Sequence, residues 1–134
     1  MKNTIILLTM LLFSGIGFAQ ESNNGKQLWA KSFLNEKAPE LTVETWISKK
    51  PDTEGKFVII DFWATWCGPC RKAIPELNEI AKEFSKDVVV IGISDEPVEK
   101  IKAMKEPVIE YYYGVDTKKT MDKILEIKGI PHVI

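Results

Sequence analysis

One stretch decides the fold of this chain: Phe57-Val58-Ile59-Ile60-Asp61-Phe62-Trp63-Ala64-Thr65-Trp66-Cys67-Gly68-Pro69-Cys70. Its first half, residues 57–63, is a nearly continuous apolar run, which is typical of a central strand covered on both faces. A helical pattern with apolar residues on one face follows from Arg71 through Phe84. The only two cysteines of the chain, Cys67 and Cys70, therefore lie where a strand turns into a helix. Their C-x-x-C spacing at this place predicts a reversible redox pair that performs thiol–disulfide exchange.

The rest of the chain alternates between strand and helix patterns. Strands are predicted over residues 41–47, 88–93, 108–114 and 130–134. One helix is predicted to start after Asp95-Glu96-Pro97. Another is predicted from Asp116 or Thr117 to Ile127, and Gly129 is expected to end it. Pro75 should kink the helix after the cysteines, because proline removes an N–H and clashes with the preceding turn. A short element is also predicted over residues 26–34. The order β-α-β-α-β-α-β indicates an α/β fold class whose sheet is at least partly parallel.

Length and charge limit the number of domains and the kinds of partner that the chain can have. At 134 residues the chain has room for one domain once targeting segments are removed. Its formal net charge is −1, and the charged residues are spread throughout. Because they form no basic stripe, the sequence gives no electrostatic support for a nucleic-acid partner.

The first residues have the pattern of a signal peptide. Lys2 supplies a positive start, residues 5–18 are uncharged and mostly apolar, and Gly17-Phe18-Ala19 offers small residues for cleavage after Ala19. An uncleaved membrane anchor is the alternative, but the run is short for a span of about 20 residues. We therefore expect a signal peptide over 1–19, an N-terminal extension over 20–37 and a periplasmic or otherwise extracytoplasmic location.

Export changes the interpretation of the two cysteines. An oxidising compartment favours structural disulfides. A bridge between Cys67 and Cys70 closes so small a loop, however, that it would constrain the unfolded chain very little. The pair is therefore better explained by chemistry than by stability.

Two segments resemble a known family. Residues 61–70 resemble the active-site segment of thioredoxins, and Gly129-Ile130-Pro131 resembles the cis-proline loop of the same fold. The exported N-terminus, Ala38-Pro39 and the extra helix–strand segment 97–114 resemble the periplasmic TlpA/ResA-like thiol–disulfide oxidoreductases. The resemblance covers residues 38–134. It implies a thioredoxin-like fold, with a central mixed sheet flanked by helices and a helix–strand insertion.

The motif assigns a role to each cysteine and to its neighbours. Cys67 lies at the helix start, where unpaired N–H groups and the helix dipole stabilise a thiolate, so it is the expected nucleophile. Cys70, one turn further and shielded, is expected to resolve the mixed disulfide. Gly68 allows the tight turn and Pro69 suits a first helical turn. Trp66 is expected to cover the disulfide and contact partners.

Asp61 is the candidate acid–base residue. An ionised carboxylate in the middle of an apolar strand is unfavourable, so burial should raise its pKa toward neutral pH. By resemblance, Asp61 matches the buried acid that helps to deprotonate the resolving cysteine. A strand-end carboxylate that reaches solvent is the alternative. Some exported relatives carry an acid three residues after the second cysteine; that position is Ala73 here, so Asp61 or Glu76 would have to serve.

The segment around Pro131 is the candidate substrate platform. By resemblance, Pro131 is cis and faces the disulfide, and the backbone of Ile130 pairs with an incoming peptide as a strand would. An ordinary trans proline at a strand start is the alternative. His132, the only histidine, could tune the thiols or bind a metal, but a solvent-facing strand histidine is the more common case.

These features predict an exported thiol–disulfide oxidoreductase with no cofactor beyond the Cys67–Cys70 pair and no metal. The Gly-Pro dipeptide resembles that of reducing thioredoxins, so we expect reduction of protein disulfides, with apocytochrome c cysteines or mispaired periplasmic disulfides as clients. A reductant in an oxidising compartment requires a membrane electron donor.

Two other functions stay open at this point. One is a copper or zinc carrier that uses Cys67, Cys70 and His132. The other is a non-catalytic or truncated binding domain. The thioredoxin fold continues past the cis-proline strand with an edge strand and a helix, which the sequence up to Ile134 lacks, so the domain is expected to be C-terminally incomplete.

Overall fold

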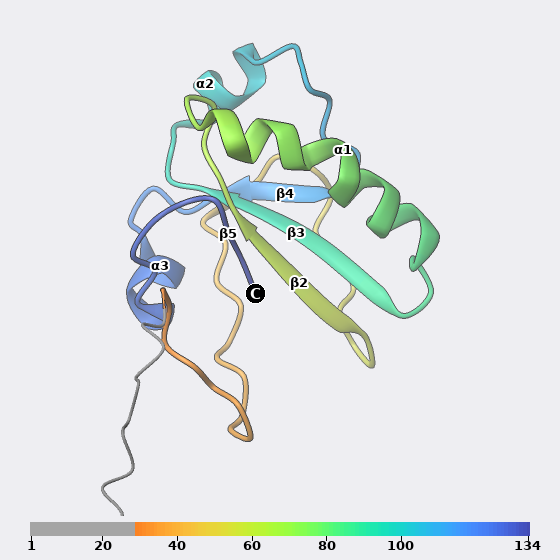
Figure 1. The fold of residues 1–134 in the computed structure, drawn as a ribbon, viewed down its shortest axis with the longest axis vertical. Coiled ribbons are helices and arrows are strands. Elements are labelled where there is room, and N and C mark those ends of the chain that lie inside the picture. Colours follow the sequence, from red (N-terminus) through yellow and green to blue (C-terminus); the bar gives the residue numbers. More distant parts are fainter. Residues whose placement is uncertain (1–28) are drawn as a thin grey trace, which may run out of the picture.

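The computed structural model describes residues 29–134. The predicted signal peptide and residues 20–28 of the predicted extension lie outside the described residues. The elements, in chain order, are β1 (Thr45–Trp46), β2 (Phe57–Phe62), α1 (Gly68–Glu83), β3 (Val88–Ser94), α2 (Val98–Ala103), β4 (Tyr112–Val115), α3 (Thr120–Leu125) and β5 (His132–Val133) (Figure 1).

The strands form one mixed sheet in the order β1-β4-β3-β2-β5. β2, β3 and β4 are parallel, whereas β1 and β5 are antiparallel to their neighbours. Asp61 of β2 pairs with Gly92 of β3 on one side and with Val133 of β5 on the other. The predicted α/β class with a central mixed sheet is confirmed.

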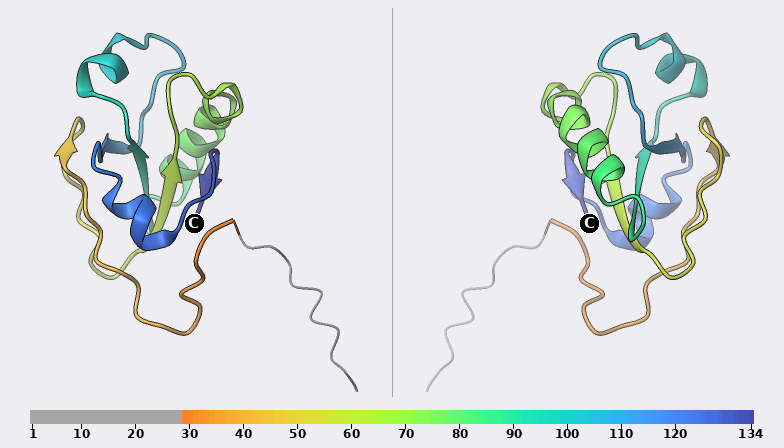
Figure 2. Two further views of the ribbon diagram at one scale, coloured as in Figure 1. Left: turned by 90° about the vertical axis from the view of Figure 1, so that its left-hand side faces the viewer. Right: turned by 90° about the vertical axis from the view of Figure 1, so that its right-hand side faces the viewer.

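The sheet separates two apolar cores. Viewed edge-on, it has α1 on one side and α3 on the other (Figure 2). Side chains alternate along a strand, so β2 contributes Val58, Ile60 and Phe62 to one face and Ile59 and Asp61 to the other. The core under α1, here called the disulfide core, contains Trp63, Ala64, Cys67, Cys70, Ile74, Leu77, Val90, Ile101, Tyr111 and Val115. The core under α3, the α3 core, contains Phe62, Val89, Ile91, Ile93, Met121 and Leu125.

Two predicted strands are shorter in the structure. Of residues 41–47 only Thr45 and Trp46 pair with β4. Residues 108–110 do not join the sheet, because the Asn78 side chain of α1 bonds the carbonyl of Val108 at 2.9 Å and the N–H of Glu110 at 2.8 Å. This tertiary contact diverts the backbone from the strand that its composition predicts.

The helix ends also differ from the prediction. α1 begins at Gly68 rather than Arg71 and continues to Glu83 with Pro75 inside it. The N-cap residue of α3 is Lys119 rather than Asp116 or Thr117, although the carboxylate of Asp116 accepts a 2.7 Å bond from the N–H of Met121 in the first turn. α3 ends at Leu125, because Glu126 adopts a left-handed conformation at φ 52°, so the stop falls before Gly129.

The segment before β1 forms no helix or strand over residues 29–34, where a short element is predicted. It is held instead by single backbone bonds. The N–H of Lys31 donates to the carbonyl of Leu125 at 2.7 Å, and the N–H of Lys128 donates to that of Trp29 at 3.0 Å. Phe33 packs against the α3 core. The segment therefore covers the sheet face opposite the cysteines.

Candidate active site

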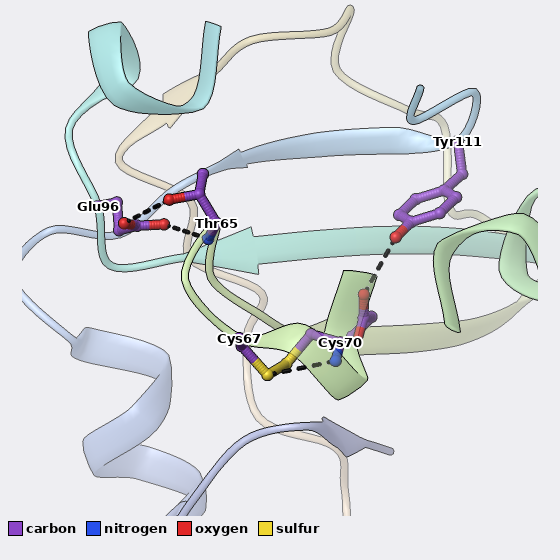
Figure 3. The surroundings of a disulfide bond; sticks show 6 residues. Thr65, Cys67, Cys70, Glu96 and Tyr111 are labelled. Atoms are coloured by element: carbon purple, nitrogen blue, oxygen red, sulfur yellow. Dashed lines mark hydrogen bonds between the residues drawn. A yellow bond between two sulfur atoms is a disulfide. The ribbon is translucent and has the colours of Figure 1, made fainter. Parts of the chain in front are cut away.

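Cys67 and Cys70 form a disulfide at the N-terminus of α1 (Figure 3). Cys67 is the N-cap residue of the helix, and its sulfur accepts a 3.3 Å hydrogen bond from the N–H of Cys70. Cys67 is 4% exposed and Cys70 is fully buried. The helix N–H groups and dipole act directly on the sulfur of Cys67, an environment that stabilises a thiolate.

The surroundings of the disulfide are open on one side. Trp66 is 68% exposed, and Gly68 and Pro69 are exposed beside it. Pro69 lies in the first turn of α1, where no N–H is required. Trp63, four residues before Cys67, is instead fully buried. Trp63 therefore belongs to the core, whereas Trp66 faces solvent beside the disulfide.

A buried glutamate anchors the turn that precedes Cys67. Glu96 accepts hydrogen bonds from the N–H of Thr65 at 2.5 Å and from its hydroxyl at 2.9 Å, and it pairs with Lys100 at 2.6 Å. Burial raises the pKa of Glu96, but the bonds from Lys100 and Thr65 outweigh it and hold the pKa below its usual range. From the sequence, Glu96 is identified only as part of a predicted helix start. The i, i+4 spacing to Lys100 is the one local signal of its role.

Asp61 lies on the face of β2 that α1 covers, and it is 1% exposed. Burial raises its pKa to about 6, although a hydrogen bond from Tyr111 opposes the rise. The alternative of a carboxylate that reaches solvent is therefore wrong. Glu76, the other acid considered, is exposed on α1. Asp61 is thus a buried carboxyl that changes its charge near neutral pH.

Tyr111 is a site residue that the sequence does not predict. Its hydroxyl donates to Oδ2 of Asp61 at 3.1 Å, and in Figure 3 the ring points toward the helix that carries Cys70. Burial, and next the nearby Asp61 carboxylate, raise the pKa of Tyr111, so it stays a donor. From the sequence, the three consecutive tyrosines 111–113 are members of a predicted strand, and no local pattern singles out Tyr111.

The candidate substrate platform lies between α3 and β5. The Ile130–Pro131 peptide bond is cis, as the resemblance implies, and Pro131 is exposed. Ile130 and Trp66 line a groove of about 410 Å³ together with Asp95, Lys119 and Asp122. His132 is partly buried in β5 and pairs with Phe62. The structure brings the cis-proline loop and the exposed tryptophan to the borders of one groove.

Residues 29–134 contain no group of three or more histidine, cysteine, aspartate or glutamate side chains placed to hold a metal ion. None of the helices in this range has the length and apolar character needed to cross a membrane.

A strand that leads into a helix-capping C-x-x-C disulfide, with a cis-proline before an antiparallel strand, defines a thioredoxin-like protein. Residues 34–132 match the model of the AhpC/TSA family, and the chain belongs to this family.

The relatives support the same class. Thioredoxin-like protein YneN of Bacillus subtilis is 34% identical over 68 residues, covering 48% of this chain and 40% of that protein. The thioredoxin domain of a thiol–disulfide oxidoreductase from Bacteroides vulgatus is 32% identical with a TM-score of 0.52, covering 60% of this chain and 62% of that one. A pneumococcal exposed lipoprotein thioredoxin from Streptococcus pneumoniae is 28% identical with a TM-score of 0.51, covering 58% of this chain and 64% of that one. The matches therefore span less than two thirds of these three proteins.

Proposed function

We propose that this protein is a thiol–disulfide oxidoreductase that reduces protein disulfides with Cys67 and Cys70. The observation that carries the proposal is the disulfide at the N-terminus of α1, with a buried carboxyl, Asp61, on the sheet face beneath that helix. The family and the relatives named for thiol–disulfide exchange support it. Trp66, Gly68, Pro69, Ile130 and Pro131 would contact the client chain.

The reaction has two exchange steps. In the reduced protein the Cys67 thiolate attacks a client disulfide, so that a bond forms between Cys67 and one client sulfur and the other client sulfur leaves as a thiolate. Asp61 then accepts the proton of Cys70, and the Cys70 thiolate attacks the sulfur of Cys67. The Cys67–Cys70 bond forms as the client bond breaks, and the second client thiolate leaves. Two electrons pass from the protein to the client.

The proposal extends to location and partners. The signal-peptide pattern of residues 1–19 supports an extracytoplasmic protein, as does the similarity to an exposed lipoprotein thioredoxin. In such a compartment the oxidised pair needs a membrane electron donor to regain its dithiol form. Apocytochrome c cysteines and mispaired disulfides are the clients that this arrangement would serve.

Trapping with the full chain tests the proposal. Cys70→Ser keeps the nucleophile but removes the resolving thiol, so mixed disulfides with clients should accumulate on Cys67 and separate on reduction. Cys67→Ser is the matched control, because it has the same substitution at the other cysteine. It should trap nothing and should lose all reduction of a model protein disulfide. Retained reducing activity in Cys67→Ser would sink the proposal.

A further inference from the structure

A single glycine on β3 lets two distant side chains meet under α1. Gly92 pairs with Asp61 of β2 on one side and with Tyr113 of β4 on the other. A Cβ on Gly92 would lie 3.0 Å from the ring of Tyr111 and 3.0 Å from Nε1 of Trp63. Because Gly92 has no side chain, the Tyr111 ring can cross β3 and bond the carboxyl of Asp61.

We propose that Tyr111 is a positioning residue: its hydroxyl holds Oδ2 of Asp61 and leaves Oδ1 as the proton acceptor for Cys70. This inference rests on the proposed function. In the exchange steps as proposed, Tyr111 forms and breaks no bond, and it acts through Asp61.

The two carboxyl oxygens of Asp61 have different surroundings. Oδ2 accepts the 3.1 Å bond from Tyr111, whereas Oδ1 is buried and has no hydrogen-bond partner among the described residues. A buried acceptor without a partner is unfavourable unless another group uses it. In the resolving step the Cys70 proton moves to Oδ1, and the electron pair left on sulfur forms the bond to Cys67.

Few neighbouring side chains can influence the pKa of the Asp61 carboxyl. In the part of the chain that the structure describes, the titratable side chains in the disulfide core or packed against it are Tyr111, next to β4, Tyr113 of β4, and the cysteines of α1. β3 and β5 place Gly92 and Val133 opposite Asp61, and neither carries a charge. Tyr111 is therefore the one neighbour that lowers the pKa of Asp61.

The hydrogen bond from the Tyr111 hydroxyl determines in which direction the pKa of Asp61 should change when the hydroxyl is removed. A hydroxyl that donates to a carboxylate stabilises its ionised form. Tyr111→Phe removes the donor and keeps the ring, so the pKa of Asp61 should rise. The resolving step needs ionised Asp61, and its pH midpoint should move upward by about one pH unit.

A single-turnover reaction of the reduced full chain measures the resolving step, in which Cys70 attacks Cys67, separately from the first attack. With a thionitrobenzoate disulfide as the probe, the first release of thionitrobenzoate reports attack by Cys67, and the second reports attack by Cys70. The second rate is measured against pH for the wild type and Tyr111→Phe. Tyr113→Phe is the matched control, because Tyr113 packs against the same core. It should leave the midpoint where the wild type has it.

Two further experiments keep the proposal testable if Tyr111→Phe does not fold. Because the chain has three tyrosines, 111–113, Tyr111 is the only one left in a Tyr112→Phe, Tyr113→Phe protein. Replacing it there by 3-fluorotyrosine gives a stronger donor of nearly the same size, so the midpoint should move downward. In an Asp61→Asn background, Tyr111→Phe should change nothing further.

The outcomes separate the two proposals. A wild type that shows no second release contradicts the proposed function itself. A wild type that shows both releases, with a midpoint unmoved by Tyr111→Phe or by fluorotyrosine, overturns the role of Tyr111 alone. A shift of equal size in Tyr113→Phe would also overturn it.

Discussion

The carboxyl of Asp61 has opposite effects on chemistry and on stability. Burial brings its pKa to about 6, where it can take a proton from a thiol near neutral pH. The same burial makes the ionised form unfavourable in the folded protein. Between the ordinary value of 3.8 and about 6 the folded state binds more protons than the unfolded state, so stability falls as pH rises through this window.

Asp61→Asn should remove that pH dependence. In the oxidised wild type, Asp61 should lower the free energy of unfolding by about 2 kcal/mol between pH 4 and pH 7. The variant should lack this component, so its stability relative to the wild type should rise with pH. Urea unfolding at a series of pH values measures the difference. Asp87→Asn, at an exposed aspartate, is the control. Parallel curves for wild type and Asp61→Asn would contradict the assignment.

The sequence predicts Asp61 but not its partner, and the reason is physical. The position of Asp61 inside an apolar strand is a local feature, visible within residues 57–63. The partnership with Tyr111 spans 50 residues and depends on the register of β3 and on the missing side chain of Gly92. Three consecutive tyrosines look alike until that register is known.

At the scale of elements, the loop from β3 to α2 holds the turn that carries Cys67. Glu96 in this loop bonds both the N–H and the hydroxyl of Thr65, two residues before the nucleophile. Lys100 in α2 pairs with the same carboxylate. The active-site turn is thereby fixed to an element 31 residues further along the chain.

Glu96→Gln should loosen this turn. Loss of the charged acceptor should lower the free energy of unfolding by about 1–3 kcal/mol at pH 7. Because the pKa of Glu96 is lowered in the folded state, its contribution is complete above the ordinary value of 4.5 and is lost as pH falls below it. Chemical denaturation at pH 7 and pH 3 checks the trend. Glu99→Gln, in the first turn of α2, is the control. An effect of Glu96→Gln that persists unchanged at pH 3 would argue against it.

Elements with strong local patterns were predicted well, and elements defined by tertiary bonds were not. β2, β3 and α1 lie where their apolar periodicity predicts them, within a few residues at each end. β4 is shorter than its composition suggests, because Asn78 of α1 takes the backbone groups that a longer strand would need. Such a contact joins residues about 30 positions apart and leaves no local signal.

At the scale of the whole molecule, the sheet separates the core that contains the redox site from the core that contains apolar side chains alone among its buried members. The disulfide core contains both cysteines and Tyr111 under α1. The α3 core on the other face contains Met121 and Leu125 and no titratable side chain among its buried members. Packing on the α1 face should therefore control the chemistry, while packing on both faces supports the fold.

Two neighbouring valines of β3 test this separation. Val89 is 3% exposed in the α3 core, and Val90 is 1% exposed in the disulfide core. Val89→Ala and Val90→Ala remove the same atoms, and each should lower the free energy of unfolding by about 1–3 kcal/mol. Only Val90→Ala should let water approach Asp61 and return its pKa toward 3.8. The pH dependence of unfolding should therefore weaken in Val90→Ala and persist in Val89→Ala, and an equal change in both variants would show that the two cores are not independent.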